Sequence, residues 1–252
     1  MTMQVNDAHL SGRYTTTRAQ LLDGVGKVLA RRVGVAAVTE VRGRHDDLHR
    51  LDGVAVHLPA TSTAADCAIL VDTRVGAIAD RGHAVLSRGH GKARSTIVLS
   101  WALIELDAGG TLLRAGFHAP ASVQRGHGFS KLAADRGNVT AWQAALDELP
   151  RVLCDLIAEH QPDETVLSAD WNVHLRLRSW RRLINQKLKP TGLRLVVPRR
   201  ATIGRTRVID AHATTMRRRP MSWALRVFDL FRGWDHRPVV ARLKSRRKKR
   251  RK

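Results

Sequence analysis

The 252-residue chain is long enough for one large domain or two small ones, and its 43% hydrophobic content is typical of a folded globular protein. It carries 44 Lys and Arg against 22 Asp and Glu, a formal net charge of +22. Such a surface attracts polyanions, so nucleic acid is the first candidate partner and an anionic membrane surface the second. No apolar run reaches the roughly 18 residues of a spanning helix, and two cysteines are too few for a disulfide scaffold.

The first third of the chain predicts a strand, a helix and further strands. Residues 3–6 read as a short strand, and 15–32 as an amphipathic helix that Thr16 or Thr17 can cap. Buried strands follow at 35–41, 54–58 and 68–72, and residues 42–52 and 80–95 are expected to form loops. The order of strand, helix and strand places Glu40 at a strand end, where functional groups often lie.

The rest of the chain predicts a hairpin, two helices and more strands. Strands are expected at 95–106 and 112–118, joined by a Gly109-Gly110 turn, and a helix at 139–160 that Pro150 can kink or split. A strand and turn at 165–172 and a basic helix at 176–187 come next, then strands at 193–197, 205–211 and 239–243. We expect a single domain over 1–243 and a disordered polybasic tail over 244–252.

Three local patterns allow more than one interpretation. His45 and His49 have helical metal-ligand spacing, but a solvated turn is the favoured interpretation because no third ligand is in view. Arg-Gly-His occurs three times, beginning at Arg81, Arg88 and Arg125, either as phosphate-contacting loops or by coincidence in an Arg-rich chain. The Trp and Phe residues between 223 and 234 are assigned mainly to the core.

The stretch from Ser168 to Asn172 carries the strongest local signal for chemistry. Asp170 and Asn172 lie two residues apart where a buried strand ends, so both side chains can face one space. There the carboxylate can accept a proton or bind a metal, and the amide can donate to phosphate oxygens. An Asp-x-Asn turn that hydrogen-bonds its own backbone is the competing interpretation.

Six short motifs in order resemble the endonuclease/exonuclease/phosphatase superfamily, which includes deoxyribonuclease I and exonuclease III-type abasic endonucleases. Each follows an apolar strand, and together they cover nearly the whole chain. In chain order they are Val5-Asn6, Val38-Thr39-Glu40-Val41, Phe117-His118-Ala119-Pro120, Ala169-Asp170-Trp171-Asn172, Val208-Ile209-Asp210 and Trp234-Asp235-His236-Arg237-Pro238-Val239. Ala169 and Trp234 replace the family's Gly and Ser, and no acidic partner of His118 is evident, with Asp72 as the first guess.

The resemblance implies an α/β fold, a four-layer α-β-β-α sandwich of two packed mixed sheets with the active site at one end. It also implies a Mg²⁺ or Mn²⁺ ion held by Glu40, with Asn6 and Asp235 close by. The expected catalytic residues are Asp170 on water, Asn172 on a phosphate oxygen, His236 paired with Asp210, and His118 as a second proton-transfer group. The expected nucleic-acid contacts are Arg42, Arg125, Arg176 and Trp234.

The resulting hypothesis is a metal-dependent nuclease that hydrolyses DNA, because small-molecule phosphatases have little need for a +22 charge. A monomer in the cytoplasm is expected, since the N-terminus does not read as a signal peptide. A phosphatase or phospholipase of the same fold is the first alternative, with the basic tail on an anionic membrane. A non-catalytic nucleic-acid-binding protein is the second, and the full set of polar strand ends argues against it.

Overall fold

The computed structural model describes residues 2–11, 17–40, 45–59, 67–88, 96–121, 123–124, 136–215, 226–227 and 236–246. Of these, residues 2–11, 45–46, 136, 226–227 and 241–246 are described by their backbone alone.

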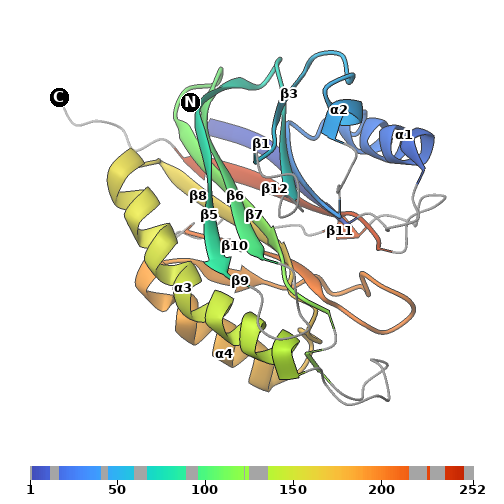
Figure 1. Ribbon diagram of the computed structural model, residues 1–252. Helices are drawn as coiled ribbons and strands as arrows, with labels where there is room; N and C mark the ends of the chain where they lie inside the picture. The colour runs from blue at the N-terminus through green and yellow to red at the C-terminus, as the bar shows by residue number, and fades with distance from the viewer. Residues whose placement is uncertain are drawn as a thin grey trace.

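Two six-stranded sheets form the centre of the molecule (Figure 1). The first has the order β11 (Arg226–Val227), β12 (Val239–Arg246), β1 (Thr2–Ser11), β2 (Val35–Thr39), β4 (Cys67–Asp72) and β3 (Val54–His57). The second has the order β5 (Gly76–Ser87), β6 (Ile97–Leu106), β7 (Thr111–His118), β8 (Glu164–Asp170), β10 (Asp210–Thr214) and β9 (Arg194–Val196). One parallel pair in each sheet, β1 with β2 and β7 with β8, makes both sheets mixed.

Helices cover the outer face of each sheet (Figure 1). The first sheet carries α1 (Arg18–Leu29) and the short α2 (His45–Leu48), whereas the second carries α3 (Arg136–His160) and α4 (Arg178–Leu188), which runs into a 3₁₀ turn, η1 (Lys189–Thr191). Separate apolar clusters fill the three interfaces, and the one between the sheets contains residues such as Ala37, Ile69 and Ile104. The predicted four-layer α-β-β-α sandwich is confirmed.

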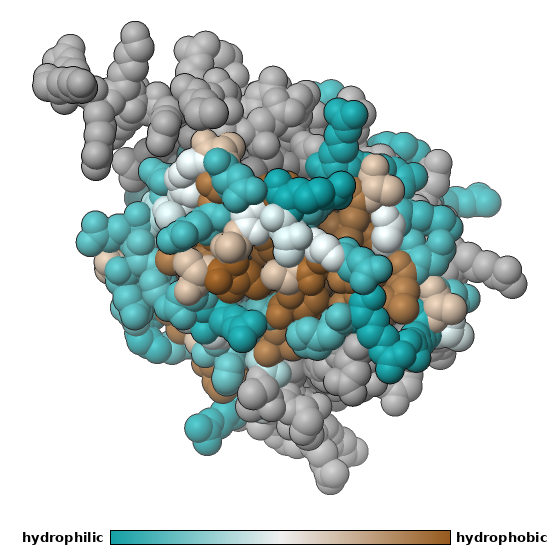
Figure 2. All heavy atoms as spheres, turned by 90° about the horizontal axis from the view of Figure 1, so that it is seen from above, coloured by the Kyte–Doolittle hydropathy of each residue, from teal (hydrophilic) through white to brown (hydrophobic). Residues whose placement is uncertain are grey.

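The surface is mostly polar despite these three cores. On the face in Figure 2, hydrophilic side chains surround a central region where apolar side chains gather. Among the described residues, Val85 is the one large apolar side chain that is clearly exposed, at 43%. No helix in the described part of the chain has the length and apolar character needed to cross a membrane.

Most predicted elements form close to their expected positions. Thr17 caps α1 in a capping box with Gln20, because each side chain accepts from the other residue's backbone N–H. Pro150 lies inside α3 without splitting it. The β6–β7 hairpin forms as expected.

The prediction of a loop over 80–95 is wrong for its first half, because residues 76–87 form the twelve-residue strand β5. This strand lies at the edge of the second sheet and most of its side chains are at least partly exposed, so the apolar alternation that signals a strand is weak. Gly82 pairs with Trp101 of β6, and a Cβ at this position would lie 2.6 Å from the Trp101 ring, so only a glycine fits here without a shift. The first Arg-Gly-His is therefore strand, and the third lies outside the described residues.

Three boundaries also differ from expectation. Strand β1 continues to Ser11, and β10 starts at Asp210 rather than at residue 205. Strand β12 runs to Arg246, where it pairs with Thr2, so the sheet extends past the expected domain end at 243. Residues 45–48 form one short helical turn within the predicted 42–52 loop.

At Gly116 of β7 the two sheets approach each other closely. An added Cβ would lie 2.7 Å from Cys67 Sγ and 3.1 Å from Ala37 Cβ. We expect Gly116→Ala to lower the free energy of unfolding by about 1–3 kcal/mol through overpacking. Gly26→Ala in α1 meets no atom within 4 Å and should instead raise it by about 0.5–1 kcal/mol. Urea denaturation of both variants checks this, and equal effects would contradict the close approach.

Candidate active site

Three polar residues lie side by side at one edge of the second sheet. His118 is the last residue of β7, Asp170 the last of β8 and Asp210 the first of β10. The register pairs His118 with Asp170 and Asp170 with Asp210. Parallel β7 and β8 end at the same edge, and antiparallel β10 starts there, so sheet pairing alone brings these residues together.

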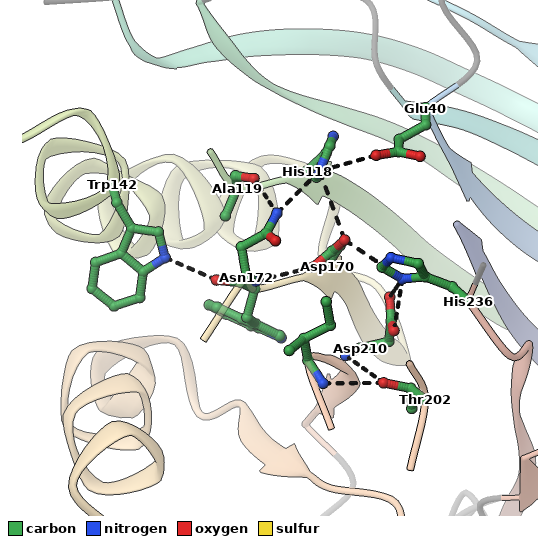
Figure 3. Close-up of polar contacts among 11 residues, drawn as sticks. Glu40, His118, Ala119, Trp142, Asp170, Asn172, Thr202, Asp210 and His236 are labelled. Atoms are coloured by element: carbon green, nitrogen blue, oxygen red, sulfur yellow. Dashed lines mark hydrogen bonds and ion pairs between the residues drawn. The ribbon is translucent and has the colours of Figure 1, made fainter. Parts of the chain in front are cut away.

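The first sheet supplies two more residues to the same place (Figure 3). Glu40 directly follows β2, and His236 lies three residues before β12. Figure 3 shows both side chains directed toward Asp170 and His118. The site therefore lies where the ends of both sheets meet, as the resemblance implies.

His236 and Asp210 form a buried pair. Nδ1 of His236 lies 3.2 Å and 3.0 Å from the two carboxylate oxygens of Asp210, and the side chains are 6% and 1% exposed. The same nitrogen is 3.7 Å from Oδ2 of Asp170. A carboxylate facing Nδ1 keeps the proton on that nitrogen, so Nε2 is the ring nitrogen suited to act on a substrate.

Asp170 is a strongly perturbed carboxyl group. Burial, and then the nearby charge of Asp210, raise its pKa to about 6, against the opposing influence of His236, His118 and the Asn172 backbone N–H. Both effects disfavour the charged form. A carboxyl group whose pKa is close to neutral can accept a proton and release it again, as a general base must.

Asn172 orients His118. Its Nδ2 donates to the Ala119 carbonyl over 2.7 Å and lies 3.1 Å from Nε2 of His118. The bond to Ala119 fixes which end of the amide carries the hydrogens, so Nε2 of His118 accepts from Asn172 and is unprotonated in this arrangement. The backbone N–H of Asn172 donates to Oδ1 of Asp170 over 2.9 Å, so the predicted Asx-type turn and the predicted site exist together.

Glu40 stands at the open side of the cluster, with a side chain 27% exposed and Oε1 3.8 Å from Nε2 of His118. Its backbone has a φ of 61°, and that of Asn172 has 50°. A left-handed backbone is unusual for a residue other than Gly, and for Glu more so than for Asn. Such strain often accompanies a functional role because the surrounding structure must enforce it.

The predictions overlooked Thr202. Its Oγ1 accepts from the backbone N–H groups of Ile209 and Asp210, over 3.0 Å and 3.3 Å. Its carbonyl accepts from the backbone N–H of Arg237, the residue after His236. One threonine thus holds the segments that carry both members of the His236–Asp210 pair. A lone Thr in a loop gives no sequence signal for this role.

A second polar link joins the sheets behind the site. Arg114, which is fully buried, donates from Nη2 to Ser168 Oγ over 2.8 Å, and Ser168 Oγ lies 2.5 Å from Nδ1 of His212. His212 Nε2 is 3.3 Å from the carbonyl of Val239 in β12. A directed chain of hydrogen bonds therefore ties β8, which ends in Asp170, to the strand that follows His236.

The strand register shows that two predicted assignments are wrong. Asp7 pairs with Val35, so Asn6 lies about six residues along the parallel strands from the level of Glu40. At about 3.3 Å per residue this is roughly 20 Å, beyond the reach of an Asn side chain. Asp72 pairs with Val54 at that same far end and forms an ion pair with Arg74, so it is not the partner of His118. The acids nearest His118 are Glu40 and Asp170, at 3.8 Å and 3.7 Å.

Several predicted residues lie outside the described ranges, namely Arg42, Arg125, Trp234 and Asp235, together with the Trp and Phe cluster apart from its strand β11. Arg176 is described and exposed, and its guanidinium donates to the carbonyl of Arg199. His49 is exposed in the turn after α2. The one metal-compatible group found among described side chains is Asp170, Asp210 and His236, whose ligand atoms lie within 4.8 Å of one another.

No protein-family model and no curated protein sequence matches the chain. Solved structures do. An endonuclease/exonuclease/phosphatase family protein from Bacteroides thetaiotaomicron has a TM-score of 0.70 at 14% identity, over 98% of this chain and 99% of that one. The chain has the fold of the endonuclease/exonuclease/phosphatase superfamily.

Other solved structures with this superfamily fold include a sugar phosphatase and a DNA-bound protein. Mannosyl-6-phosphatase from B. thetaiotaomicron has a TM-score of 0.68 at 14% identity, covering 94% of this chain and 98% of that one. TDP2 from D. rerio, complexed with a single-strand DNA product, has a TM-score of 0.64 at 12% identity, covering 95% and 98%. The superfamily fold thus supports phosphate chemistry on different substrates, and the substrate must be argued from this chain's own residues.

Proposed function

We propose that this protein is a divalent-metal-dependent phosphodiesterase, and specifically a nuclease that hydrolyses DNA. The observation that carries the proposal is the His236–Asp210 pair beside Asp170, with Glu40 and His118 on the open side of the same cluster. A superfamily fold alone is compatible with many substrates, whereas this set of acids and imidazoles at one sheet edge suits hydrolysis of a phosphate ester.

The residues present fit a hard divalent cation such as Mg²⁺ or Mn²⁺. Three carboxyl groups, of Glu40, Asp170 and Asp210, face two imidazoles, and after burial the charge of Asp210 also raises the pKa of Asp170. Glu40 offers a partly exposed oxygen ligand of the kind these ions prefer. Glu40 would hold the ion, with Asp235 as a further predicted ligand. The ion would neutralise charge on the phosphoryl and leaving oxygens.

The protein's own groups supply the proton transfers. Hydrolysis forms a bond from a water oxygen to phosphorus and breaks the bond to the leaving oxygen. Asp170 takes the proton that the water loses, and His118, whose unprotonated Nε2 lies 3.7 Å from Oδ2 of Asp170, can take up that proton and pass it to the leaving oxygen. His236 binds the scissile phosphate through Nε2, while Asp210 fixes its tautomer and orientation. Asn172 keeps His118 in place.

Charge favours nucleic acid over a small phosphate ester. The net charge of +22 exceeds what one phosphate group requires, and long polyanions bind by releasing many counterions. Arg176 is exposed and remains a predicted contact, as do Arg42, Arg125 and Trp234. The bound DNA product of the TDP2 structure shows that this fold accommodates a DNA strand in that protein. A monomer acting in the cytoplasm remains a prediction.

Hydrolysis of a phosphomonoester is the second candidate, because mannosyl-6-phosphatase has the same fold over nearly the whole chain. One substrate panel separates the two. The purified protein is incubated with supercoiled plasmid, a single-stranded oligonucleotide, RNA, bis(p-nitrophenyl) phosphate and p-nitrophenyl phosphate, with Mg²⁺, Mn²⁺ or excess chelator. We expect the metal to permit plasmid nicking and diester hydrolysis, and chelator to stop both. Turnover of the monoester without any diester cleavage would replace the nuclease by a phosphatase.

A further inference from the structure

The link between the two catalytic aspartates has an unusual charge. Residues 171–209 run from the end of β8 to the start of β10 and contain eleven Lys and Arg without one Asp or Glu. Across the whole chain the basic residues outnumber the acids only 44 to 22. The residues that bracket this link are Asp170 and Asp210, so the segment that carries the charge leaves the site and returns to it.

Most of this charge lies on the surface. Lys187 forms an ion pair with Asp147 of α3 and is partly buried, as is Arg207. The other nine are exposed, namely Arg176, Arg178, Arg181, Arg182, Lys189, Arg194, Arg199, Arg200 and Arg205. We call the exposed arginines of α4 and its N-terminal approach, with those of 199–205, the basic flank.

The basic flank is fixed to the active site at its α4 end. Trp180 of α4 packs edge-on against Trp142 of α3, with ring centroids 5.3 Å apart at 76°. Trp142 Nε1–H donates over 3.0 Å to the carbonyl of Trp171, which follows Asp170 (Figure 3). The helix therefore keeps a defined position relative to the catalytic carboxylate, and binding to it need not order a loop.

The other end of the basic flank is fixed as well. The guanidinium of Arg176 donates to the carbonyl of Arg199, which joins the approach to α4 to the 199–205 segment. Thr202, inside that segment, bonds the backbone N–H of Asp210. The flank thus connects to a catalytic aspartate at both ends, through Trp142 and Trp171 at the α4 end and through Thr202 at the other.

The geometry of α4 suits a phosphate backbone. Arg178, Arg181 and Arg182 are spaced three and four residues apart and share the exposed side of the helix. Eleven helical residues span about 16 Å, which is about five phosphates of one strand at roughly 3.4 Å of duplex axis each. The apolar side chains of α4 pack against the core, Ile184 and Leu188 fully buried and Trp180 and Leu183 partly buried, so the helix offers no apolar face to a bilayer.

We infer that the basic flank is a nucleic-acid-binding surface, which holds the phosphate backbone beside the scissile bond and extends the substrate footprint beyond the catalytic site. The inference rests on the proposed function only in placing the flank beside a bond that is cleaved. Binding by the flank can be measured without cleavage.

The test compares two triple variants of the full chain with equal loss of charge. One carries Arg178→Gln, Arg181→Gln and Arg182→Gln in α4. The control carries Arg31→Gln, Arg50→Gln and Arg81→Gln, exposed positions near α1, β3 and β5 away from the site. Gln is a good helix former, so α4 should persist. Binding of a labelled 20-base-pair duplex is titrated in chelator at several salt concentrations, and vesicles containing phosphatidylserine are titrated in parallel.

We expect the α4 triple variant to raise the Kd for duplex at least tenfold and to lower the slope of log K against log salt by about 2–3, at roughly 0.9 per lost phosphate contact. The control should change Kd less than threefold. Equal losses in both variants would reduce the effect to net charge and overturn the inference, as would no loss in either. A loss of vesicle binding larger than the loss of duplex binding would assign the flank to membranes.

Hydrolysis of bis(p-nitrophenyl) phosphate, measured on the same samples with Mn²⁺, separates this inference from the proposed function. A wild-type protein that fails to cleave any diester but binds duplex through α4 would refute the proposed function and leave the basic flank in place. A wild-type protein that cleaves DNA while the α4 variant binds it normally would refute the basic flank alone.

Discussion

Replacing His236 by alanine is expected to slow diester hydrolysis by roughly 10²–10⁴-fold, the usual contribution of a positioned acid–base group. The buried Asp210 carboxylate, 3.0 Å from Nδ1, orients this imidazole toward the site. Initial rates of bis(p-nitrophenyl) phosphate hydrolysis with Mn²⁺ measure the loss.

Two comparisons make this result specific. His83→Ala, at an exposed position of β5, should retain the wild-type rate. Asp210→Asn should also lower the rate, and combining it with His236→Ala should add little, because groups that act as a unit are not additive. Full activity of His236→Ala, or losses that multiply in the double variant, would show that the pair does not work as proposed.

Replacing Asp170 by asparagine is expected to abolish hydrolysis and to make the fold more stable at pH 8. The pKa of Asp170 is raised to about 6 from 3.8, chiefly by burial and then by Asp210, so the folded state binds this proton more tightly than the unfolded state does. Stability from this group is therefore complete below about pH 4 and is lost as the pH rises to about 6. Between those values the loss is at most on the order of 3 kcal/mol.

Asparagine cannot ionise, so the variant should escape that loss. Thermal denaturation in chelator should show Asp170→Asn more stable than wild type at pH 8 and similar to it at pH 4. Asp107→Asn, in the exposed β6–β7 turn, is the matched control and should have the stability of the wild-type protein at both pH values. A variant that is less stable than wild type at both pH values would mean that the carboxylate is held by favourable partners rather than strained by its burial. Such a gain in stability on removing a catalytic group is a known trade-off.

The sequence predicted the fold and much of the site because both depend on strand ends. Glu40, His118, Asp170, Asp210 and His236 each adjoin an apolar strand, and a sheet brings such ends to one edge whatever the loops do. Their order along the chain was visible in the motifs. The capping of α1 by Thr17 and the β6–β7 hairpin are local features, which short-range sequence signals specify well.

The errors arose where the answer depends on register or on distant contacts. Asn6 has the right neighbours in sequence, but β1 continues five residues to Ser11, and only the pairing with β2 reveals that. The sequence does not predict strand β5 because an edge strand needs no alternation of apolar and polar residues. Gly82 resembles a loop residue, but it makes room for the Trp101 ring, nineteen residues away. Thr202 acts on Asp210 and on the residue after His236 through hydrogen bonds that no local pattern encodes.

The most direct test of the account is the rate at which supercoiled plasmid is nicked in Mn²⁺ by wild-type protein and by Asp170→Asn protein purified side by side. The account predicts nicking by the wild-type protein that chelator stops, and none by the variant above the buffer control. Equal nicking by the two proteins would contradict it, because the cleavage would then come from somewhere other than the cluster around Asp170.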